Sequence, residues 1–209
     1  ISRAILKKNP GMFRNIIYGF TTSLEPHPVP NDPRCFFAKF YSFLVSPLYF
    51  YALYDYERDE FPVWSGDFAE EGWPIELREF LRRFLEENLS ILEDMVSGRV
   101  LEFSTDFFSE NFAVDPRGRF VVFGAEVKGK YVVGREKERL NTFAVLWFDL
   151  RSGRFLHVEF GPPDVFCPWN FGVLGDGSTV VLADGGVFVY DSSFRLVRQY
   201  YLVLDFRYG

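Results

Sequence analysis

The sequence predicts an α+β, mainly β protein, in which antiparallel four-stranded meanders follow an N-terminal helical, aromatic-rich part. Three observations lead to this fold class. After Gly98, short runs of alternating apolar and polar residues are separated by Gly, Pro, Asp and Asn, as is typical of strands and turns. Residues 73–96 carry apolar side chains at helical spacing. The segment that begins at Asn111 is nearly repeated from Asn170.

The composition allows a buried core and disfavours nucleic acid as the main partner. The chain has 209 residues, of which 48% are hydrophobic and 20% aromatic, including 26 Phe. Such residues either fill a Phe-packed core or form an aromatic surface for a partner, and the core is the simpler interpretation. The net charge of −6 argues against a dedicated nucleic-acid-binding protein, which needs a basic surface.

Residues 1–72 form the least regular third of the chain. The stretch "EPHPVPNDPR", residues 25–34, contains four prolines and predicts an extended loop. The run "FFAKFYSFLVSPLYFYALY", residues 36–54, predicts a buried helical hairpin broken at Ser46-Pro47. A partner-facing aromatic surface is the second interpretation. A membrane span needs about 20 apolar residues, and Lys39, Pro47 and the hydroxyl groups disfavour one here.

Residues 73–96 predict one amphipathic helix that packs on the β domain. Pro74 suits its first turn, and Ser97-Gly98 suits its end. The apolar stripe consists of Leu77, Phe80, Leu81, Phe84, Leu85, Leu89, Leu92 and Met95. We therefore divide the chain into an aromatic and proline-rich region at 1–72, a helix at 73–97 and a β-meander domain at 98–209.

The β-meander domain is expected to contain ten short strands. They are predicted near 99–104, 111–115, 119–126, 130–134, 142–149, 154–160, 170–174, 178–183, 186–191 and 195–204. No helical pattern lies between them, so the strands are expected to be antiparallel.

The internal repeat has a constant offset at first and a shorter one later. Six residues (Asn111, Phe112, Val114, Gly118, Val121 and Val122) match residues 59 positions downstream. Phe148-Asp149 matches Tyr190-Asp191 at an offset of 42. The difference indicates an insertion in the first copy, "EVKGKYVVGREKERLNT" or nearly so. The repeated unit is a four-stranded meander whose third strand ends in an aromatic residue and Asp.

This unit resembles a β-propeller blade of the broad WD-like class over residues 98–205. The resemblance rests on "FAVDPRGRFVVFG", "LWFDLRSGRF" and "FGVLGDGSTVVLADGGVFVYDSSFRL", whereas the Trp-Asp and Gly-His marks of WD repeats are missing. A blade takes about 40 to 45 residues, so this part of the chain holds two blades and part of a third. The resemblance leaves three arrangements open: the end of a longer propeller, a propeller completed by another chain, or an open sheet or sandwich.

No catalytic constellation is visible in the sequence. The histidines are His27, in the proline-rich loop, and His157, on a predicted strand. The cysteines, Cys35 and Cys167, are far apart, so no disulfide framework is expected and a reducing compartment is the default. Cys167, flanked by Pro and Trp, is expected to be a buried packing residue. We identify no catalytic residue, no metal ligand and no cofactor motif, so a non-enzymatic role is favoured while an enzyme stays open.

The insertion supplies the candidate partner-binding residues, which are Lys128, Lys130, Tyr131, Arg135, Lys137 and Arg139. We expect it to project as a hairpin, either as a plain solvated surface or as a contact for an acidic protein or for RNA phosphates. The sequence thus predicts a non-catalytic, intracellular (cytoplasmic or nuclear) binding or scaffold protein in a larger assembly. The alternatives are a fragment of a propeller-type hydrolase and a membrane-associated factor that uses residues 36–54.

Overall fold

The protein is mainly β and contains three antiparallel sheets and two helices in the part of the chain that is described. The computed structural model describes residues 22–29, 32, 34–42, 48–55, 57–58, 60–64, 77–106, 112–165 and 167–201. The N-terminal sheet has the order β1-β2-β3-β4, the central sheet β5-β7-β8-β9 with β6 on β7, and the C-terminal sheet β10-β11-β12-β13. The elements are β1 (Thr22–Pro28), β2 (Cys35–Ser42), β3 (Leu48–Asp55), β4 (Glu60–Trp64), α3 (Leu77–Glu87), α4 (Ser90–Val96), β5 (Arg99–Asp106), β6 (Phe112–Val114), β7 (Phe120–Val133), β8 (Glu136–Asp149), β9 (Phe155–Phe160), β10 (Pro168–Val173), β11 (Thr179–Ala183), β12 (Gly186–Tyr190) and β13 (Leu196–Tyr201).

The expected helical hairpin at 36–54 is wrong. This stretch forms β2 and β3, which pair antiparallel from Cys35↔Asp55 to Ser42↔Leu48. Phe and Tyr favour strands. Their pairing in a four-stranded sheet stabilises the strand conformation more than the weak helical tendency of this apolar run stabilises a helix. The break expected at Ser46-Pro47 lies outside the described residues. Among the helices that are described, none is long and apolar enough to cross a membrane.

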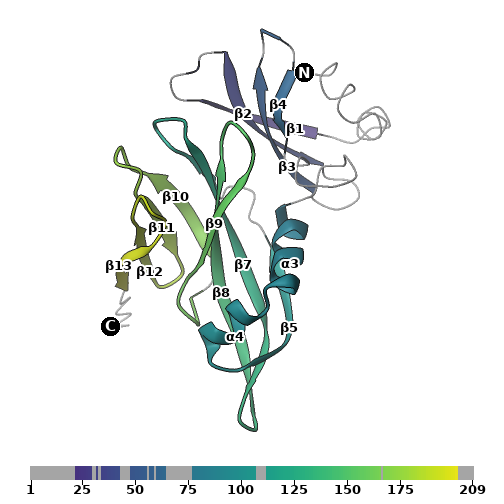
Figure 1. The fold of residues 1–209 in the computed structure, drawn as a ribbon, viewed down its shortest axis with the longest axis vertical. Coiled ribbons are helices and arrows are strands. Elements are labelled where there is room, and N and C mark those ends of the chain that lie inside the picture. Colours follow the sequence, from purple (N-terminus) through teal and green to yellow (C-terminus); the bar gives the residue numbers. More distant parts are fainter. Residues whose placement is uncertain are drawn as a thin grey trace, which may run out of the picture.

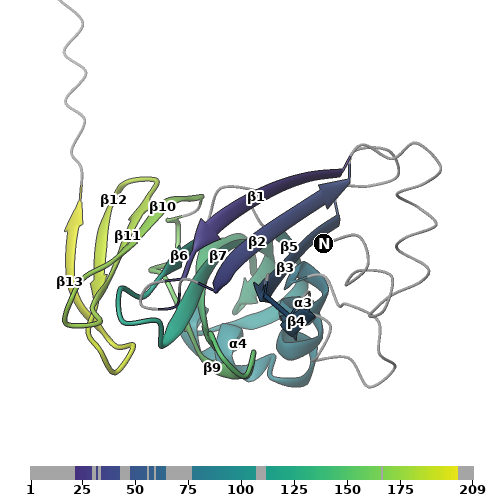
Figure 2. The same ribbon diagram turned by 90° about the horizontal axis from the view of Figure 1, so that it is seen from above.

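The central sheet forms the middle layer of the molecule. Figures 1 and 2 show α3 and α4 on one side of this sheet and the C-terminal sheet on the other. Side chains alternate between the two sides, as strand geometry requires. Val121, Phe123, Ala125, Val127, Leu146 and Phe148 point to the helices, whereas Phe120, Val122, Phe143, Val145 and Trp147 point to the C-terminal sheet. Each side therefore has its own hydrophobic core.

The helical segment packs on the central sheet as expected, but as two helices. Phe80 contacts Phe148 edge to face at 5.4 Å between ring centroids, and Leu92 is fully buried in the same core. The side chain of Leu77 is not described. The chain turns at Asn88, whose side-chain amide donates to the carbonyl of Phe84 at 2.8 Å, and a second helix starts two residues later. Asn competes with the helical backbone for hydrogen bonds, so it ends α3.

The repeat in the sequence corresponds to two meanders with the same strand order. The first meander is β6-β7-β8-β9, and the second is β10-β11-β12-β13. Their first turns close in the same way. Gly118 donates to the carbonyl of Asp115 at 2.8 Å, and Gly177 donates to that of Leu174 at 2.9 Å. Both glycines have positive φ, 68° and 96°, a conformation that other residues rarely adopt.

The later parts of the two meanders also agree. A bulge interrupts the pairing of the third and fourth strands just before Phe148 in the first meander and just before Tyr190 in the second. The side chains of Asp149 and Asp191 then accept hydrogen bonds from backbone N–H groups of the following turns. The match of Phe148-Asp149 with Tyr190-Asp191 is therefore confirmed in three dimensions.

Part of the expected alignment is wrong by one residue. The sequence matched Val121 with Val180, but the pairing makes Val121 equivalent to Thr179. Val121 pairs with Val114 of β6, and Thr179 pairs with Val173 of β10. The same shift applies to the next valine. The cause is the first turn, which holds one more residue than its counterpart.

With this register, the two meanders stack in the same sense. Phe112 and Phe123 of the first meander point to the helices. Their equivalents in the second meander, Phe171 and Val181, point to the first meander. Equivalent faces of the two sheets therefore point in the same direction, and the second meander is related to the first by a displacement of one layer. Non-equivalent faces of the two sheets meet where they pack together. The indole of Trp147 joins the layers by donating to the hydroxyl of Thr179 at 3.0 Å.

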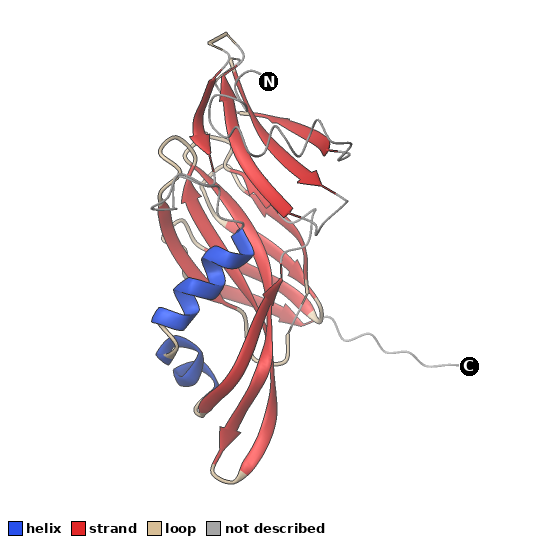
Figure 3. Ribbon diagram, turned by 90° about the vertical axis from the view of Figure 1, so that its right-hand side faces the viewer, coloured by secondary structure: helices blue, strands red, loops and turns tan. Residues whose placement is uncertain are grey.

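Two expected strands merge, and the insertion is a hairpin. The strands predicted at 119–126 and 130–134 are one strand, β7, which passes through Gly129. A Cβ at Gly129 would lie 2.1 Å from the carbonyl oxygen of Glu102, so glycine here allows β5 to approach. The inserted residues lengthen β7 and β8, and Figure 3 shows this hairpin extending beyond the helices.

Candidate partner-binding site

The candidate site is the outer part of the β7–β8 hairpin. The two strands pair without interruption from Phe120↔Asp149 to Val133↔Glu136, and Gly134-Arg135 form the turn at the tip. Gly134 has a φ of 63°, which suits a two-residue hairpin turn. β5 pairs with β7 up to Arg99↔Val132, so the hairpin is supported along one edge. Its outer part is therefore a sheet of three strands, in which the β5–β7 register shifts once, between Val100 and Glu102.

Strand pairing places four of the six predicted residues on one face. Lys130 lies directly opposite Arg139, and Lys128 and Lys137 lie at the neighbouring positions of the same face. All four side chains are exposed. We call this surface the basic face; it consists of Lys128, Lys130, Lys137 and Arg139. Glu136 and Glu138 alternate with these cations along β8 and therefore lie on the opposite face.

The other two predicted residues lie elsewhere. Tyr131 is on the opposite face from the cations, beside Glu138, and its half-buried ring packs against the core under the helices. It acts as a core residue, so a partner on the basic face does not reach it. Arg135 is exposed in the turn at the tip. The alternation of β7 alone separates Tyr131 from the lysines on either side of it, and this period-two signal was available in the sequence.

Two of the four cations are already paired. Lys128 contacts Glu126 and Lys130 contacts Glu102, each at 2.6 Å. The hydrogen bond and the charge of Lys130, with a smaller effect of Lys137, lower the pKa of the Glu102 carboxyl. Lys137 and Arg139 form no ion pair with any of the described residues. The basic face therefore retains two cations that an acidic partner can pair.

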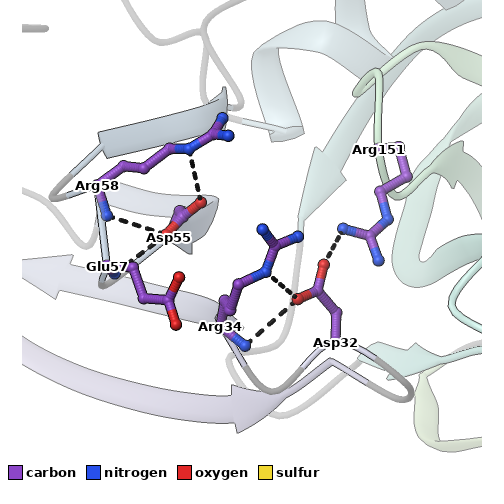
Figure 4. Close-up of polar contacts among 6 residues, drawn as sticks. All are labelled: Asp32, Arg34, Asp55, Glu57, Arg58 and Arg151. Atoms are coloured by element: carbon purple, nitrogen blue, oxygen red, sulfur yellow. Dashed lines mark hydrogen bonds and ion pairs between the residues drawn. The ribbon is translucent and has the colours of Figure 1, made fainter.

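A second polar feature, which the sequence did not indicate, joins the N-terminal and central sheets. Figure 4 shows Asp32, in the turn between β1 and β2, accepting a hydrogen bond from Arg151 at 2.6 Å. The backbone N–H and the Nε of Arg34 donate to the same carboxylate at 3.3 and 3.4 Å. Asp32 is 6% exposed, and Val29 and Cys35 beside it enter the core on the helix side. This ion pair ties the two sheets together.

The Asp32 carboxyl gives the protein a pH-dependent contact between sheets. Chiefly the hydrogen bond from Arg151 lowers its pKa, against the opposing effect of burial. A carboxyl with a lowered folded pKa stabilises the fold above its unfolded pKa of about 3.9, and this contribution is lost as the pH falls below that value. We expect Asp32→Asn to be less stable than the natural protein at pH 7, and the difference to shrink between about pH 4 and pH 2.

Urea unfolding at several pH values measures this difference. Arg151→Met should reproduce the effect of Asp32→Asn, whereas Arg154→Met should not, because Arg154 is exposed in the same turn and its side chain pairs with no described residue. A difference between Asp32→Asn and the natural protein that stays constant down to pH 2 would show that the Asp32 charge does not stabilise this contact.

The first turns of the two meanders are joined by an arginine. Asp115 is fully buried and accepts hydrogen bonds from Arg119 Nε and Nη2 at 2.8 and 2.9 Å. Burial alone would raise the pKa of Asp115, but the hydrogen bonds from Arg119 outweigh it and the pKa is lowered. The same guanidinium lies against Gly177, where a Cβ would approach it to 2.3 Å. The first turns therefore contribute to the stacking of the two meanders.

The cysteines and His157 are packing residues in the structure. Cys35 is buried and Cys167 is half-buried, and burial raises the pKa of both thiols, which disfavours the reactive thiolate. His157 packs against the rings of Trp147 and Phe194 and contacts Glu159 at 3.2 Å. The side chain of His27 is not described. In the described part of the chain, no group of three or more His, Cys, Asp and Glu residues is arranged to hold a metal ion.

Comparisons with known proteins place the chain in no family. No family model matches it. No curated protein matches it either.

Proposed function

We propose that this chain is a non-catalytic binding or scaffold protein, an intracellular subunit of a larger protein assembly, which contacts an acidic protein surface through the basic face of its β7–β8 hairpin. One observation carries the proposal: Lys137 and Arg139 are exposed on the same face as Lys128 and Lys130, without ion-pair partners among the described residues. The uninterrupted pairing of β7 with β8 holds these cations in fixed positions. An acidic surface with complementary spacing pairs with them at little entropic cost.

We further propose that the two stacked meanders are units of the propeller-blade type. Their shared strand order, first turns, bulges and sense of stacking support this view. In this role the stacked sheets form a rigid platform, and the long hairpin is the contact element that extends from it.

The double variant Lys137→Glu/Arg139→Glu tests the role of the basic face. A labelled 20-residue poly-glutamate peptide serves as the acidic probe, and fluorescence anisotropy at low salt measures its binding. We expect the variant to bind about tenfold more weakly, because it replaces two attractive charges, each worth up to about 1 kcal/mol, with repulsive ones. Raising the salt concentration should weaken the binding of the natural protein as well.

Glu136→Gln/Glu138→Gln is the matched control, because it changes charges at neighbouring positions of β8 on the opposite face. It should bind the probe at least as well as the natural protein. If the two double variants bind alike, the basic face is not the contact surface. If a single-stranded 20-nucleotide RNA binds through the same cations and poly-glutamate does not, the partner is a nucleic acid and the proposed acidic protein surface is wrong.

A further inference from the structure

The C-terminal sheet has an apolar face that no described element covers. Alternation along β11, β12 and β13 separates the side chains that face the central sheet from those that face outward. The apolar side chains on the outer face are Val180, Leu182, Val187, Val189 and Tyr200. Leu182 is 40% exposed and Tyr200 is 53% exposed. Figures 1 and 2 show no helix or strand outside this sheet.

The equivalent face of the first meander is covered. By strand pairing, Val187 corresponds to Val145 and Val189 corresponds to Trp147. Val145 and Trp147 are both fully buried, and the layer that buries them is the C-terminal sheet itself. Because the two meanders stack by a shift from layer to layer, the same step continued once more places another sheet on the outer face.

We propose that the outer face of the C-terminal sheet docks an antiparallel sheet of a partner chain, stacked in the same sense as the two meanders. The partner sheet presents an apolar face like that of Phe171, Val181 and Phe188, which cover the first meander. This inference rests on the proposed role as an assembly subunit. Its docking face contains none of the residues of the basic face, so the two proposals can fail separately.

One difference between the meanders specifies the partner further. Leu182 occupies the position of Gly124, since Gly124 pairs with Val145 and Leu182 pairs with Val187. Gly124 leaves room for the ring of Phe171, which would lie 2.2 Å from a Cβ at this position. The leucine on the outer face fills that space. The partner sheet therefore carries a small side chain where the C-terminal sheet carries Phe171.

A second copy of this chain fits the outer face poorly. The opposite faces of both meanders are already covered, so among the described faces of the two meanders a second copy offers the same outer face. Pairing two such faces brings two copies of Arg198, which lies beside Val189, into one interface, where the two like charges repel at a distance set by how the copies are aligned. A partner sheet of different sequence avoids this repulsion.

The chain's own second meander serves as the probe for docking. The tandem variant carries residues 161–201 a second time after Tyr201, together with Leu182→Gly to admit the second copy of Phe171. Phe160 and Tyr201 hold equivalent positions at the ends of β9 and β13, so the added segment follows the same junction as the original one. If the outer face docks a sheet, the added meander covers Val187 as the existing one covers Val145.

The readout is the effect of Val187→Lys on thermal unfolding. In the chain with Leu182→Gly alone, Val187 is on an open face, and we expect the melting temperature to change by no more than about 2 °C. In the tandem variant, Val187→Lys buries an unpaired charge, and we expect the melting temperature to fall by at least about 5 °C more. Equal effects in the two backgrounds, including the case in which the added meander does not fold, would overturn the proposal.

Two further measurements identify the occupant. The tandem variant with Leu182 retained should show a smaller effect of Val187→Lys, because the leucine collides with the second Phe171; an undiminished effect contradicts the small side chain assigned to the partner. Sedimentation velocity tests whether a second copy covers the face. The natural chain should form no dimer that is lost on the substitution Val187→Lys. If such a dimer forms, a second copy covers the face and the partner sheet is wrong.

Discussion

Gly124→Val is expected to lower the free energy of unfolding by about 3 kcal/mol and to loosen the C-terminal sheet from the central sheet. A Cβ at this position would lie 2.2 Å from one ring carbon of Phe171, 2.4 Å from another and 3.0 Å from Pro168. Both neighbours belong to β10 and are buried, so they cannot move away without shifting that strand. Overpacking of this kind costs about 1–3 kcal/mol, and backbone displacement puts this site at the upper end.

Urea unfolding followed by the fluorescence of Trp147 measures the effect, because this indole lies between the two sheets. The matched control is Gly172→Val. Gly172 is also in a strand, but a Cβ there meets nothing within 4 Å. The control should be neutral or slightly stabilising, since valine suits strands better than glycine does. Equal losses in both variants would mean that the cost comes from the backbone and not from the contact between sheets.

Local sequence patterns were sufficient for most of the C-terminal half. Strands such as β11 and β12 are short apolar, β-branched or aromatic runs that end at Asp-Gly or Asp-Ser turns, so each was predicted within one or two residues. Gly129 misled the prediction because a glycine inside a strand looks like a break from the sequence alone. Its cause, the approach of β5, is a contact between strands that no local pattern contains.

The N-terminal sheet was missed for a different reason. The run at 36–54 is apolar at nearly every position, so neither period two nor period 3.6 is visible in it. Its aromatic content favours strands, and this is the conformation that the pairing of β2 with β3 stabilises. The break of the helix after Glu87 was also visible in principle, because Asn88 is a poor helix former and Ser90 is typical of a helix start.

The candidate site was predictable only in part. The charges of the insertion were visible in the sequence, and alternation in a hairpin sorts them into a basic and an acidic face. The contact between Asp32 and Arg151 joins residues 119 positions apart, and no motif marks either of them. The outer face of the C-terminal sheet could be recognised only from the strand register of both meanders. The sequence alignment was one residue off in β7 and placed the valines of this strand on the wrong sides of the sheet.

The second large effect is expected at the contact between the helices and the central sheet, where Leu92→Asp should lower the free energy of unfolding by more than about 4 kcal/mol. Leu92 is fully buried in the core that Val121, Phe123 and Leu146 form on the helix side. Truncating such a leucine costs about 2–5 kcal/mol, and an unpaired carboxylate in the same place adds its desolvation.

Ile91→Asp is the control for this substitution, because Ile91 is the preceding residue of the same short helix and is 37% exposed. It likewise replaces a large aliphatic side chain with aspartate, but at a position that water reaches. It should therefore lower the free energy of unfolding by less than about 1 kcal/mol. The readout is again the unfolding transition of Trp147, in a background in which Trp64, Trp73 and Trp169 are Phe. Trp147 faces the C-terminal sheet, on the far side of the central sheet from Leu92. The Trp147 unfolding transition therefore moves with Leu92→Asp only if the helices and the two stacked sheets unfold as one unit. If instead a helix signal melts separately while the Trp147 transition stays in place, α4 contributes nothing to the stability of the β layers.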